Sequence, residues 1–304
     1  MVRDKNMKAK ILNGKELSEK ILANLKKEVK KSKLKLRLAV IQVGENSVSQ
    51  VFINQKKKAC EKTGINFKLF KFPAKISVLE FKKEIEKVIK SPVNSGVIIQ
   101  LPLPRTTFQE KSLTERATQK VVRGLPKKFL AEEFLNLIPE EKDVDVLSEK
   151  SLGKFYQGTL KILPPTVNGI LYLLKSYKIG SIGKNVVIVG AGRLVGFPLA
   201  TQLLKEKATL SVLNEWTRDA FSFTKKADIL ISGVGKPNLI KGNVVKKGGV
   251  VIDAGTSMKD GKLIGDVDFG SVSKKASHIT PVPGGVGPLT VACLLENLVK
   301  LNKK

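Results

Sequence analysis

The sequence predicts an α/β protein of two domains, an N-terminal α/β domain and a C-terminal domain built on a parallel sheet, with a cleft between them. Strand patterns alternate with helical patterns in both halves of the chain, which is typical of β-α-β units. In the second half, an apolar strand runs directly into a glycine-rich turn and then a helix. The length of 304 residues is sufficient for two domains that each have a core.

The elements of the first half follow from hydrophobic periodicity. Leu17, Ile21, Leu25 and Val29 recur at helical spacing and predict the first helix. Apolar or alternating runs predict strands at residues 36–43, 67–72 and 96–100, and helical periodicity predicts helices from about residue 49 and over residues 78–88.

The second half repeats this alternation. Thr166 is expected to cap a helix that runs through Tyr177. Strands are predicted at residues 185–189, 209–213, 229–232 and 250–253, with helices over residues 194–205 and about 289–301.

Composition excludes several classes of protein. The hydrophobic fraction of 42% is ordinary for a globular chain, and no apolar run approaches the ~18 residues of a membrane span. The first ten residues are polar and do not resemble a secretory signal. Cys60 and Cys293 lie far apart, and with a single histidine, His278, they predict no metal site. We therefore expect reduced thiols and a cytoplasmic location.

The net charge of +28 comes mainly from lysines scattered over most predicted helices. This distribution favours a solvated surface, with attraction of small acidic substrates as a second interpretation. Nucleic-acid binding is less favoured, because aromatic residues make up 6% of the chain and are mostly phenylalanines inside apolar runs.

The glycine-rich turn predicts a dinucleotide site. Glycines let the backbone N–H groups at a helix N-terminus approach a pyrophosphate, although the spacing here is one residue longer than the common fingerprint. A glycine turn without a ligand is the alternative. The candidate cofactor-binding residues of the turn are Gly190, Ala191, Gly192, Arg193, Val195 and Gly196. The domains are then expected at residues 1–149 and at residues 150–285 (Rossmann-like, NAD(P)-binding), with a C-terminal helix at residues 286–304 that packs back on the first domain.

The choice between NAD and NADP depends on the end of the next strand. Glu215 lies there, and its carboxylate can accept hydrogen bonds from the adenosine ribose and would repel a 2′-phosphate. Glu215 thus favours NAD, whereas Arg193 is the counter-indication. A solvated loop acid is an equally ordinary interpretation of Glu215.

Three segments of the sequence offer groups for substrate chemistry. Ser49, Phe52 and Lys56 share one face of a predicted helix, and a lysine beside a cleft can act as an acid or base. Gln100 ends a buried strand, where ligands bind in open α/β sheets. The segment 281–288 is rich in proline and glycine, which suits close approach to a flat ligand or a tight interdomain turn.

Together these segments resemble the methylenetetrahydrofolate dehydrogenase/methenyltetrahydrofolate cyclohydrolase family over almost the whole chain. The similarity runs in order through VGENSVSQVFINQKKKAC, GVIIQLPLP, PEEKDVD, VVIVGAGRLVGFP, ADILISGVGKP, GVVIDAG, GDVDF and ITPVPGGVGPLT. The resemblance implies that Lys56 is catalytic, that Gln100 works with it and that Asp145 binds the pterin. It implies further substrate-binding residues, which are Ser49, Phe52, Pro283, Gly284 and Gly285, and a further cofactor residue, Thr256.

The family's activities are therefore expected here. They are oxidation of methylenetetrahydrofolate with NAD or NADP and hydrolysis of methenyltetrahydrofolate, by a homodimer joined through the cofactor domain. Because Phe52 stands where the family has tyrosine, a monofunctional dehydrogenase is an alternative. A non-catalytic folate- or nucleotide-binding protein, or a basic nucleic-acid-associated protein, is the alternative from another class.

Other departures from the family carry expectations of their own. Val146 replaces a glycine after Asp145, so the turn there is expected to avoid a conformation that only glycine adopts. The turn reads Gly190-Ala191-Gly192 in place of G-R-S, and the residues after the next strand also differ, which strengthens the preference for NAD. An insertion at about residues 103–124 is expected to be a polar surface excursion, with a lid or partner-contact element as the alternative.

Overall fold

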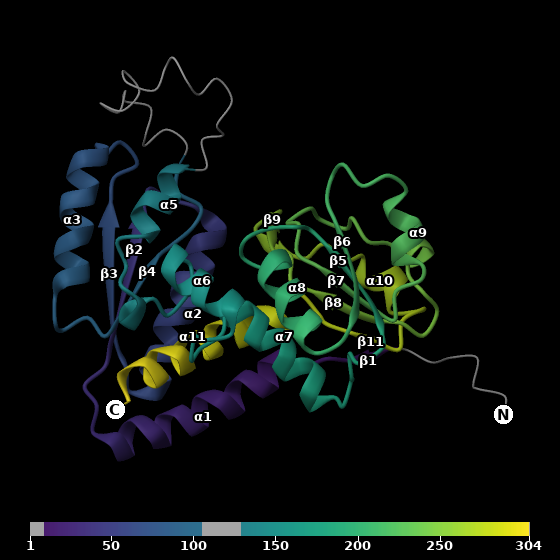
Figure 1. The fold of residues 1–304 in the computed structure, drawn as a ribbon, viewed down its shortest axis with the longest axis horizontal. Coiled ribbons are helices and arrows are strands. Elements are labelled where there is room, and N and C mark those ends of the chain that lie inside the picture. Colours follow the sequence, from purple (N-terminus) through teal and green to yellow (C-terminus); the bar gives the residue numbers. More distant parts are fainter. Residues whose placement is uncertain (1–8, 105–128, 304) are drawn as a thin grey trace. The chain divides into compact units, whose positions relative to one another are not determined.

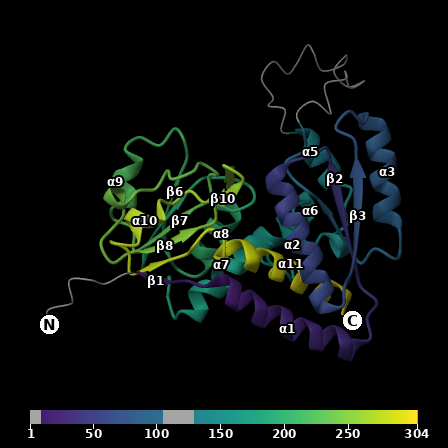
Figure 2. The same cartoon turned by 180° about the vertical axis from the view of Figure 1, so that it is seen from behind.

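The computed structural model describes residues 9–104 and 129–303, so all but the first two residues of the expected insertion lie outside the described residues. The chain forms two compact units, each of which is described by itself (Figures 1 and 2). The six-stranded unit contains the chain up to Ile21 together with Pro164–Cys293. The three-stranded unit contains Leu22–Leu163 and the chain from Leu294 onward.

The three-stranded unit is built on a parallel sheet with the order β3-β2-β4. Its strands are β2 (Arg37–Val43), β3 (Asn66–Phe72) and β4 (Gly96–Ile99), and its first helices are the later part of α1 (Gly14–Ser32), α2 (Ser47–Thr63) and α3 (Val78–Lys90). All six elements were expected from the sequence, and their bounds agree to within about three residues.

Helix α2 has side-chain and backbone signals at both ends. The side chain of Asn46 accepts a hydrogen bond from the backbone N–H of Ser49 at 2.9 Å, which caps the first turn. Gly64 follows the last residue with a φ of 78°, and its N–H donates to the carbonyl of Cys60.

The two faces of this sheet are covered by different helices. Ala39, Ile41 and Val43 pack with buried residues of α3, so the alternate residues of β2 lie on the opposite face. Right-handed connections place α2 and α3 on opposite faces, because β3 and β4 lie on either side of β2. Gly96 on the α2 face has no room for a side chain, since a Cβ would come within 2.6 Å of Val144.

The rest of this unit consists of short helices and the end of the C-terminal helix. The elements are α5 (Phe129–Leu135), η1 (Glu140–Lys142), α6 (Glu149–Gln157) and α11 (Val286–Asn302). Phe155 of α6 packs in a small core with Val146 and Ile162. The side-chain amide of Asn297 in α11 donates to the carbonyls of Val144 at 3.0 Å and Leu163 at 2.8 Å.

The six-stranded unit has an all-parallel sheet with the order β1-β11-β8-β7-β5-β6. Its strands are β1 (Lys10–Ile11), β5 (Asn185–Val189), β6 (Thr209–Leu213), β7 (Ile229–Ser232), β8 (Val250–Asp253) and β11 (His278–Ile279). The four longer strands have the bounds expected from the sequence. The pairing of β1 with β11 was not expected, because two residues are too few to show a period.

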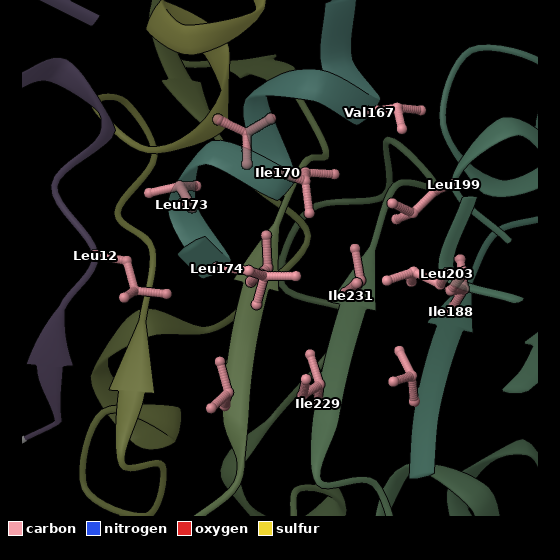
Figure 3. Packing of buried hydrophobic residues seen from close by; sticks show 14 of the residues in the cluster. Leu12, Val167, Ile170, Leu173, Leu174, Ile188, Leu199, Leu203, Ile229 and Ile231 are labelled. Atoms are coloured by element: carbon pink, nitrogen blue, oxygen red, sulfur yellow. The ribbon is translucent and has the colours of Figure 1, made fainter. Parts of the chain in front are cut away.

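Both faces of this sheet are buried. Helices α7 (Pro165–Ser176) and α8 (Gly196–Lys205) contribute Ile170, Leu173, Leu199 and Leu203 to one core, where they meet Ile188 and Ile231 of the sheet (Figure 3). The opposite face packs on a second core, and an antiparallel pair of strands lies outside the main sheet. The remaining elements are α9 (Ala220–Thr224), η2 (Gly242–Val244), β9 (Ser257–Lys259), β10 (Lys262–Ile264) and α10 (Phe269–Val272).

One expected helix cap was wrong. Helix α7 begins at Pro165, with Pro164 at the capping position, so Thr166 lies inside the first turn. Proline at the first helical position needs no N–H partner and has a suitable φ, which starts the helix without a side-chain cap. The hydroxyl of Thr166 instead accepts a hydrogen bond from Thr290 at 3.2 Å.

The compact units divide at different places from the expected domain bounds. The expected bounds near residues 150 and 286 lie before the divisions at Leu163/Pro164 and Cys293/Leu294. Helix α6 falls before the first division because Phe155 packs with Val146 and Ile162. Within the two described ranges, none of the helices combines the length and apolar character that a membrane crossing requires.

Candidate active site and dinucleotide site

Lys56 and Gln100 meet at the carboxyl end of the three-stranded sheet. Nζ of Lys56 in α2 donates a hydrogen bond to Oε1 of Gln100 at 2.8 Å, and the lysine is 6% exposed. Nε2 of Gln100 donates to the carbonyl of Leu101 at 3.0 Å, which turns the amide oxygen toward the lysine. Ser49 donates to the same carbonyl at 3.2 Å, and Phe52 is half-buried on the same helix. The structure therefore brings Ser49 and Lys56 of α2 into contact with the residues at the end of β4.

A carboxylate acts on the lysine electrostatically. Burial lowers the pKa of Lys56, while the negative charge of Asp145 opposes this effect. Burial raises the pKa of Asp145, and the charge of Lys56 opposes the rise. Burial also raises the pKa of the nearby Cys60 thiol to about 12, so this cysteine stays neutral. Lys56 and Asp145 are thus two titratable groups that influence each other's protonation at one site.

The turn that carries Asp145 differs from the expectation. Val146 adopts a left-handed conformation with a φ of 56°, the region that was expected to be avoided. The carboxylate of Asp143 enforces this turn, because it accepts hydrogen bonds from the N–H groups of Leu147 at 3.1 Å and Ser148 at 2.9 Å. The valine side chain is fully buried, so packing and these hydrogen bonds together outweigh the backbone strain.

The glycine-rich turn of the six-stranded unit is tightly packed at two of its three glycines. Gly190 has a φ of 106°, and a Cβ there would lie 2.9 Å from the carbonyl of Gly233. A Cβ on Gly196 would overlap the carbonyl oxygen of Gly190, so the start of α8 packs directly against the turn. Gly192 is exposed and has open space around it. Packing therefore requires glycine at the two ends of the turn and leaves the middle open.

A pocket of about 460 Å³ lies beside this turn at the carboxyl ends of β5 and β6. Of the residues expected to bind the cofactor, Gly190 and Glu215 line this pocket, just after the ends of β5 and β6. The pocket lining also includes polar residues that the sequence analysis missed, although they follow strand ends: Asn214, Thr217 and Lys236. Arg193 and Thr256, both half-buried, lie outside this lining. The first turn of α8 has no side-chain cap; the N–H of Phe197 donates to the carbonyl of Gly192 at 3.1 Å, and Pro198 has no N–H.

The loops beside the pocket are fixed by two buried carboxylates that the sequence analysis missed. Asp266 accepts hydrogen bonds from the N–H groups of Val234 at 2.7 Å and Lys236 at 2.8 Å. Asp253 accepts hydrogen bonds from the N–H groups of Gly255 at 3.0 Å and Asp266 at 3.1 Å. Burial raises the pKa of Asp253 to about 7, against the effect of these hydrogen bonds. The sequence alone does not distinguish Asp253 and Asp266 from aspartates on the protein surface.

The segment 281–288 forms a turn that packs on the start of α1. Gly284 has a φ of 112°, and its carbonyl accepts a hydrogen bond from the N–H of Lys15 at 2.8 Å. A Cβ on Gly285 would lie 2.6 Å from the carbonyl of Pro281. Pro283 is exposed. Both glycines are therefore required by the turn itself.

Comparison with known proteins gives a consistent result over the whole chain. Residues 12–122 match the catalytic domain of tetrahydrofolate dehydrogenase/cyclohydrolase, and residues 164–304 match its NAD(P)-binding domain. The bifunctional protein FolD of Nautilia profundicola is 41% identical over 297 residues, which cover 96% of this chain and 97% of that protein.

Two solved structures extend the comparison. The bifunctional FolD enzyme from Campylobacter jejuni superposes with a TM-score of 0.83 at 38% identity, covering 96% of this chain and 98% of that one. The Trypanosoma brucei enzyme, solved with NADP and an inhibitor, has a TM-score of 0.83 at 30% identity, covering 96% and 97%.

The two units define an α/β enzyme with a catalytic domain and a Rossmann-like NAD(P)-binding domain. The chain belongs to the tetrahydrofolate dehydrogenase/cyclohydrolase family. The resemblance seen in the sequence is confirmed.

Proposed function

We propose that Lys56 carries out the proton transfer of the hydrolytic reaction of the family and that Gln100 holds the lysine in position. The chain is a bifunctional enzyme that oxidises methylenetetrahydrofolate with a nicotinamide dinucleotide and hydrolyses methenyltetrahydrofolate. The observation that carries the assignment is the buried hydrogen bond of 2.8 Å between Lys56 Nζ and Gln100 Oε1. One N–H of the amine is held by the amide, which directs the lone pair of a neutral lysine elsewhere, toward a proton donor.

In the hydrolytic reaction, Lys56 accepts a proton from the attacking water. Burial lowers the pKa of the lysine, which increases the neutral fraction that can act as a base. Asp145 is proposed to bind the pterin, and Ser49 and Phe52 to line the same substrate site. Pro283, Gly284 and Gly285 are assigned to the substrate by resemblance, and the cleft between the domains stays a prediction.

In the oxidation, a nicotinamide dinucleotide, when bound, would supply the group that accepts the hydride from the methylene carbon. The glycine turn from Gly190 to Gly196, with Ala191, Gly192, Arg193 and Val195, is proposed to hold the pyrophosphate at the start of α8, and Thr256 to contact the cofactor. The open space at Gly192, beside the start of α8, fits this role.

We propose NAD as the preferred acceptor. The carboxylate of Glu215 lies in the lining of the pocket beside Gly190, where it would repel a 2′-phosphate and accept ribose hydroxyls. Lys236 also lines the pocket, and its positive charge would instead attract a 2′-phosphate and so favour NADP. Values of kcat/KM for oxidation with each dinucleotide test this proposal, and a preference for NADP would contradict it.

We propose a homodimer that forms through the six-stranded unit. Phe197 and Leu204 of α8 are 55% and 60% exposed, and Val212 lies on β6 at the sheet edge, where it is 37% exposed. A second copy of the chain would bury this apolar surface. Cys60 and Cys293 are buried and are not joined in a disulfide, which supports a reducing compartment, and we propose a cytoplasmic location.

The test of the catalytic assignment uses both reactions on one preparation. We expect Lys56→Met to abolish methenyltetrahydrofolate hydrolysis, because the substitution removes the amine that accepts the proton. The matched control is Lys57→Met, which removes an exposed lysine from the same helix and should leave hydrolysis unchanged. Full hydrolysis by Lys56→Met would remove Lys56 from the mechanism.

A further inference from the structure

Gln42 lies beside Gln100 at the carboxyl end of the three-stranded sheet. Strands β2 and β4 pair in parallel up to Ile41 and Ile99, and the N–H of Gln100 continues the ladder to the carbonyl of Ile41 at 2.8 Å. Extending the register by one residue sets Gln42 next to Gln100. Side chains alternate along β2, and Ile41 and Val43 face the core on the α3 side. Gln42 therefore lies on the α2 face, the face of the sheet on which Lys56 reaches Gln100.

The side chain of Gln42 has an unused hydrogen-bond acceptor. Gln42 is 3% exposed, and within the part of the chain that the structure describes, no donor reaches its Oε1. A buried amide oxygen without a donor destabilises a protein, because it has lost its hydrogen bonds to water. The residues that precede it on this face of β2 are Leu38 and Val40, which are apolar and fully buried. The amide is thus an isolated polar group at the end of an apolar row, next to the proposed catalytic pair.

The carboxyl ends of β2 and β4, where Gln42 and Gln100 lie, are also the place where the connections between strands change face. The chain leaves β2 through α2 on one face of the sheet and leaves β3 through α3 on the other. Ligands in open α/β sheets bind outside the carboxyl ends of strands where such connections diverge. An unsatisfied acceptor at this point is suited to a bound donor rather than to a structural role.

We propose that Oε1 of Gln42 accepts a hydrogen bond from the water that attacks methenyltetrahydrofolate, which makes Gln42 a positioning residue of the hydrolytic reaction. The inference rests on the proposed role of Lys56 as the base. As the water oxygen bonds to the methenyl carbon, the C=N π electrons move to nitrogen and neutralise its charge. One water proton goes to the amine of Lys56. The other proton stays on the oxygen as the hydroxyl of the adduct.

Gln42 is suited to hold the proton that stays. An amide oxygen accepts hydrogen bonds but is too weak a base to remove a proton. With one proton held by Gln42 and the other directed to Lys56, a lone pair of the water is free to face the carbon. This orientation matters only in hydrolysis, because the oxidation transfers a hydride and consumes no water. The two reactions of the enzyme therefore separate this role from a general contribution to substrate binding.

The experiment compares Gln42→Met with the unaltered enzyme in three measurements: kcat and KM for hydrolysis, kcat and KM for oxidation, and the melting temperature. Methionine preserves length and volume and removes the acceptor. We expect kcat for hydrolysis to fall roughly tenfold to a hundredfold, with kcat for oxidation within about twofold. The melting temperature should stay equal or rise, because replacing an unsatisfied buried acceptor with an apolar group is neutral or stabilising.

Val40→Ala is the matched control, since Val40 lies on the same face of β2 and is fully buried. It should lower the melting temperature and leave the ratio of the two activities unchanged. Unchanged hydrolysis by Gln42→Met would overturn the proposal. An equal fall of both activities would also overturn it, because the acceptor would then serve the substrate or the fold. Full hydrolysis by Lys56→Met would instead overturn the proposed function of the catalytic pair.

Discussion

Lys56 and Gln100 form a donor–acceptor pair in which the amide has a fixed orientation, because its own N–H group is bonded to the carbonyl of Leu101. The side chain at position 100 therefore affects the pKa of Lys56. In the proposed mechanism the neutral form of Lys56 is the base, so we expect hydrolysis to rise with pH through the pKa of Lys56. Burial lowers this pKa, which places the rise below the ordinary range of lysine.

We therefore expect opposite shifts from two substitutions at position 100. Gln100→Glu places a carboxylate beside the ammonium form, raises the pKa of Lys56 and moves the rise of hydrolysis to higher pH. Gln100→Met removes the acceptor that favours the charged form and moves the rise to lower pH. Normalised pH profiles of hydrolysis measure both shifts. Profiles that coincide would show that Lys56 is not the titrating base.

The left-handed conformation of Val146 predicts an unusual order of stabilities. At ordinary buried positions, glycine is less stable than alanine by about 1 kcal/mol or more, through lost burial and backbone entropy. At Val146, glycine also relieves a conformation that costs other residues roughly 1–2 kcal/mol. Val146→Gly should thus unfold no more easily than Val146→Ala in urea.

The neighbouring Val144 provides the control, because it is equally buried and is not left-handed. There, the glycine variant should be less stable than the alanine variant by at least about 1 kcal/mol. The same difference at both positions would contradict the strain assigned to Val146.

The cofactor preference should change when Glu215 is replaced. Glu215→Ser removes the charge that opposes a 2′-phosphate, and we expect the kcat/KM ratio of NAD to NADP to fall by roughly tenfold or more. The control Asp260→Asn removes one negative charge from the same unit, outside the pocket lining, at a φ of 50° that asparagine tolerates. An unchanged ratio in Glu215→Ser would remove this residue from specificity.

The buried carboxylate of Asp253 predicts that stability depends on pH. Its pKa of about 7 in the folded protein lies above the ordinary value of 3.8, so the folded state binds more protons between these values. Its contribution is present in full below pH 3.8 and is lost as the pH rises through about 7. The total loss is at most about 4 kcal/mol.

The contribution of Asp253 is tested by denaturant unfolding of the unaltered protein and of Asp253→Asn at several pH values. The variant is less stable overall, because its NH₂ group faces the N–H of Val267, which bonds to a carboxylate oxygen at 2.9 Å. Its free energy of unfolding should nevertheless fall less between pH 4 and pH 7 than that of the unaltered protein. Parallel pH dependences would show that Asp253 is ionised throughout this range.

The proposed dimer is tested by Leu204→Glu. A charge on this exposed apolar surface should convert the dimer to a monomer in analytical ultracentrifugation. Leu79→Glu alters a leucine that is 80% exposed in the three-stranded unit, and it should remain dimeric. Loss of the dimer in both variants would place the interface elsewhere, and a monomeric unaltered protein would contradict the proposal outright.

Periodicity in the sequence was sufficient for the longer elements. The strands at residues 185–189, 209–213, 229–232 and 250–253 match β5, β6, β7 and β8, because each is a continuous or nearly continuous apolar run next to turn residues. Strands β1 and β11 were missed, since their pairing joins segments far apart in the chain. The cap at Thr166 was wrong because the proline before it starts the helix.

The candidate site was predictable only in part. Lys56 and Gln100 follow from a helix face and a strand end, and the structure brings them into hydrogen-bond contact. The sequence does not show that Gln42 is buried with an unused acceptor, because burial of a glutamine depends on the packing of other elements. Val146 was misjudged for a related reason, since hydrogen bonds to Asp143 and tertiary packing override its backbone preference.

The hydrogen bonds of Asn297 have a consequence for how the chain is made. Its amide holds the carbonyls of Val144 and Leu163, so the three-stranded unit needs a side chain that is synthesised after the entire six-stranded unit. A ribosome extends the chain at about 5–20 residues per second. Several seconds separate the synthesis of Leu163 from that of Asn297. During this time the three-stranded unit lacks the end of α11. The three-stranded unit can therefore be completed only after the segment that follows the six-stranded unit has been made.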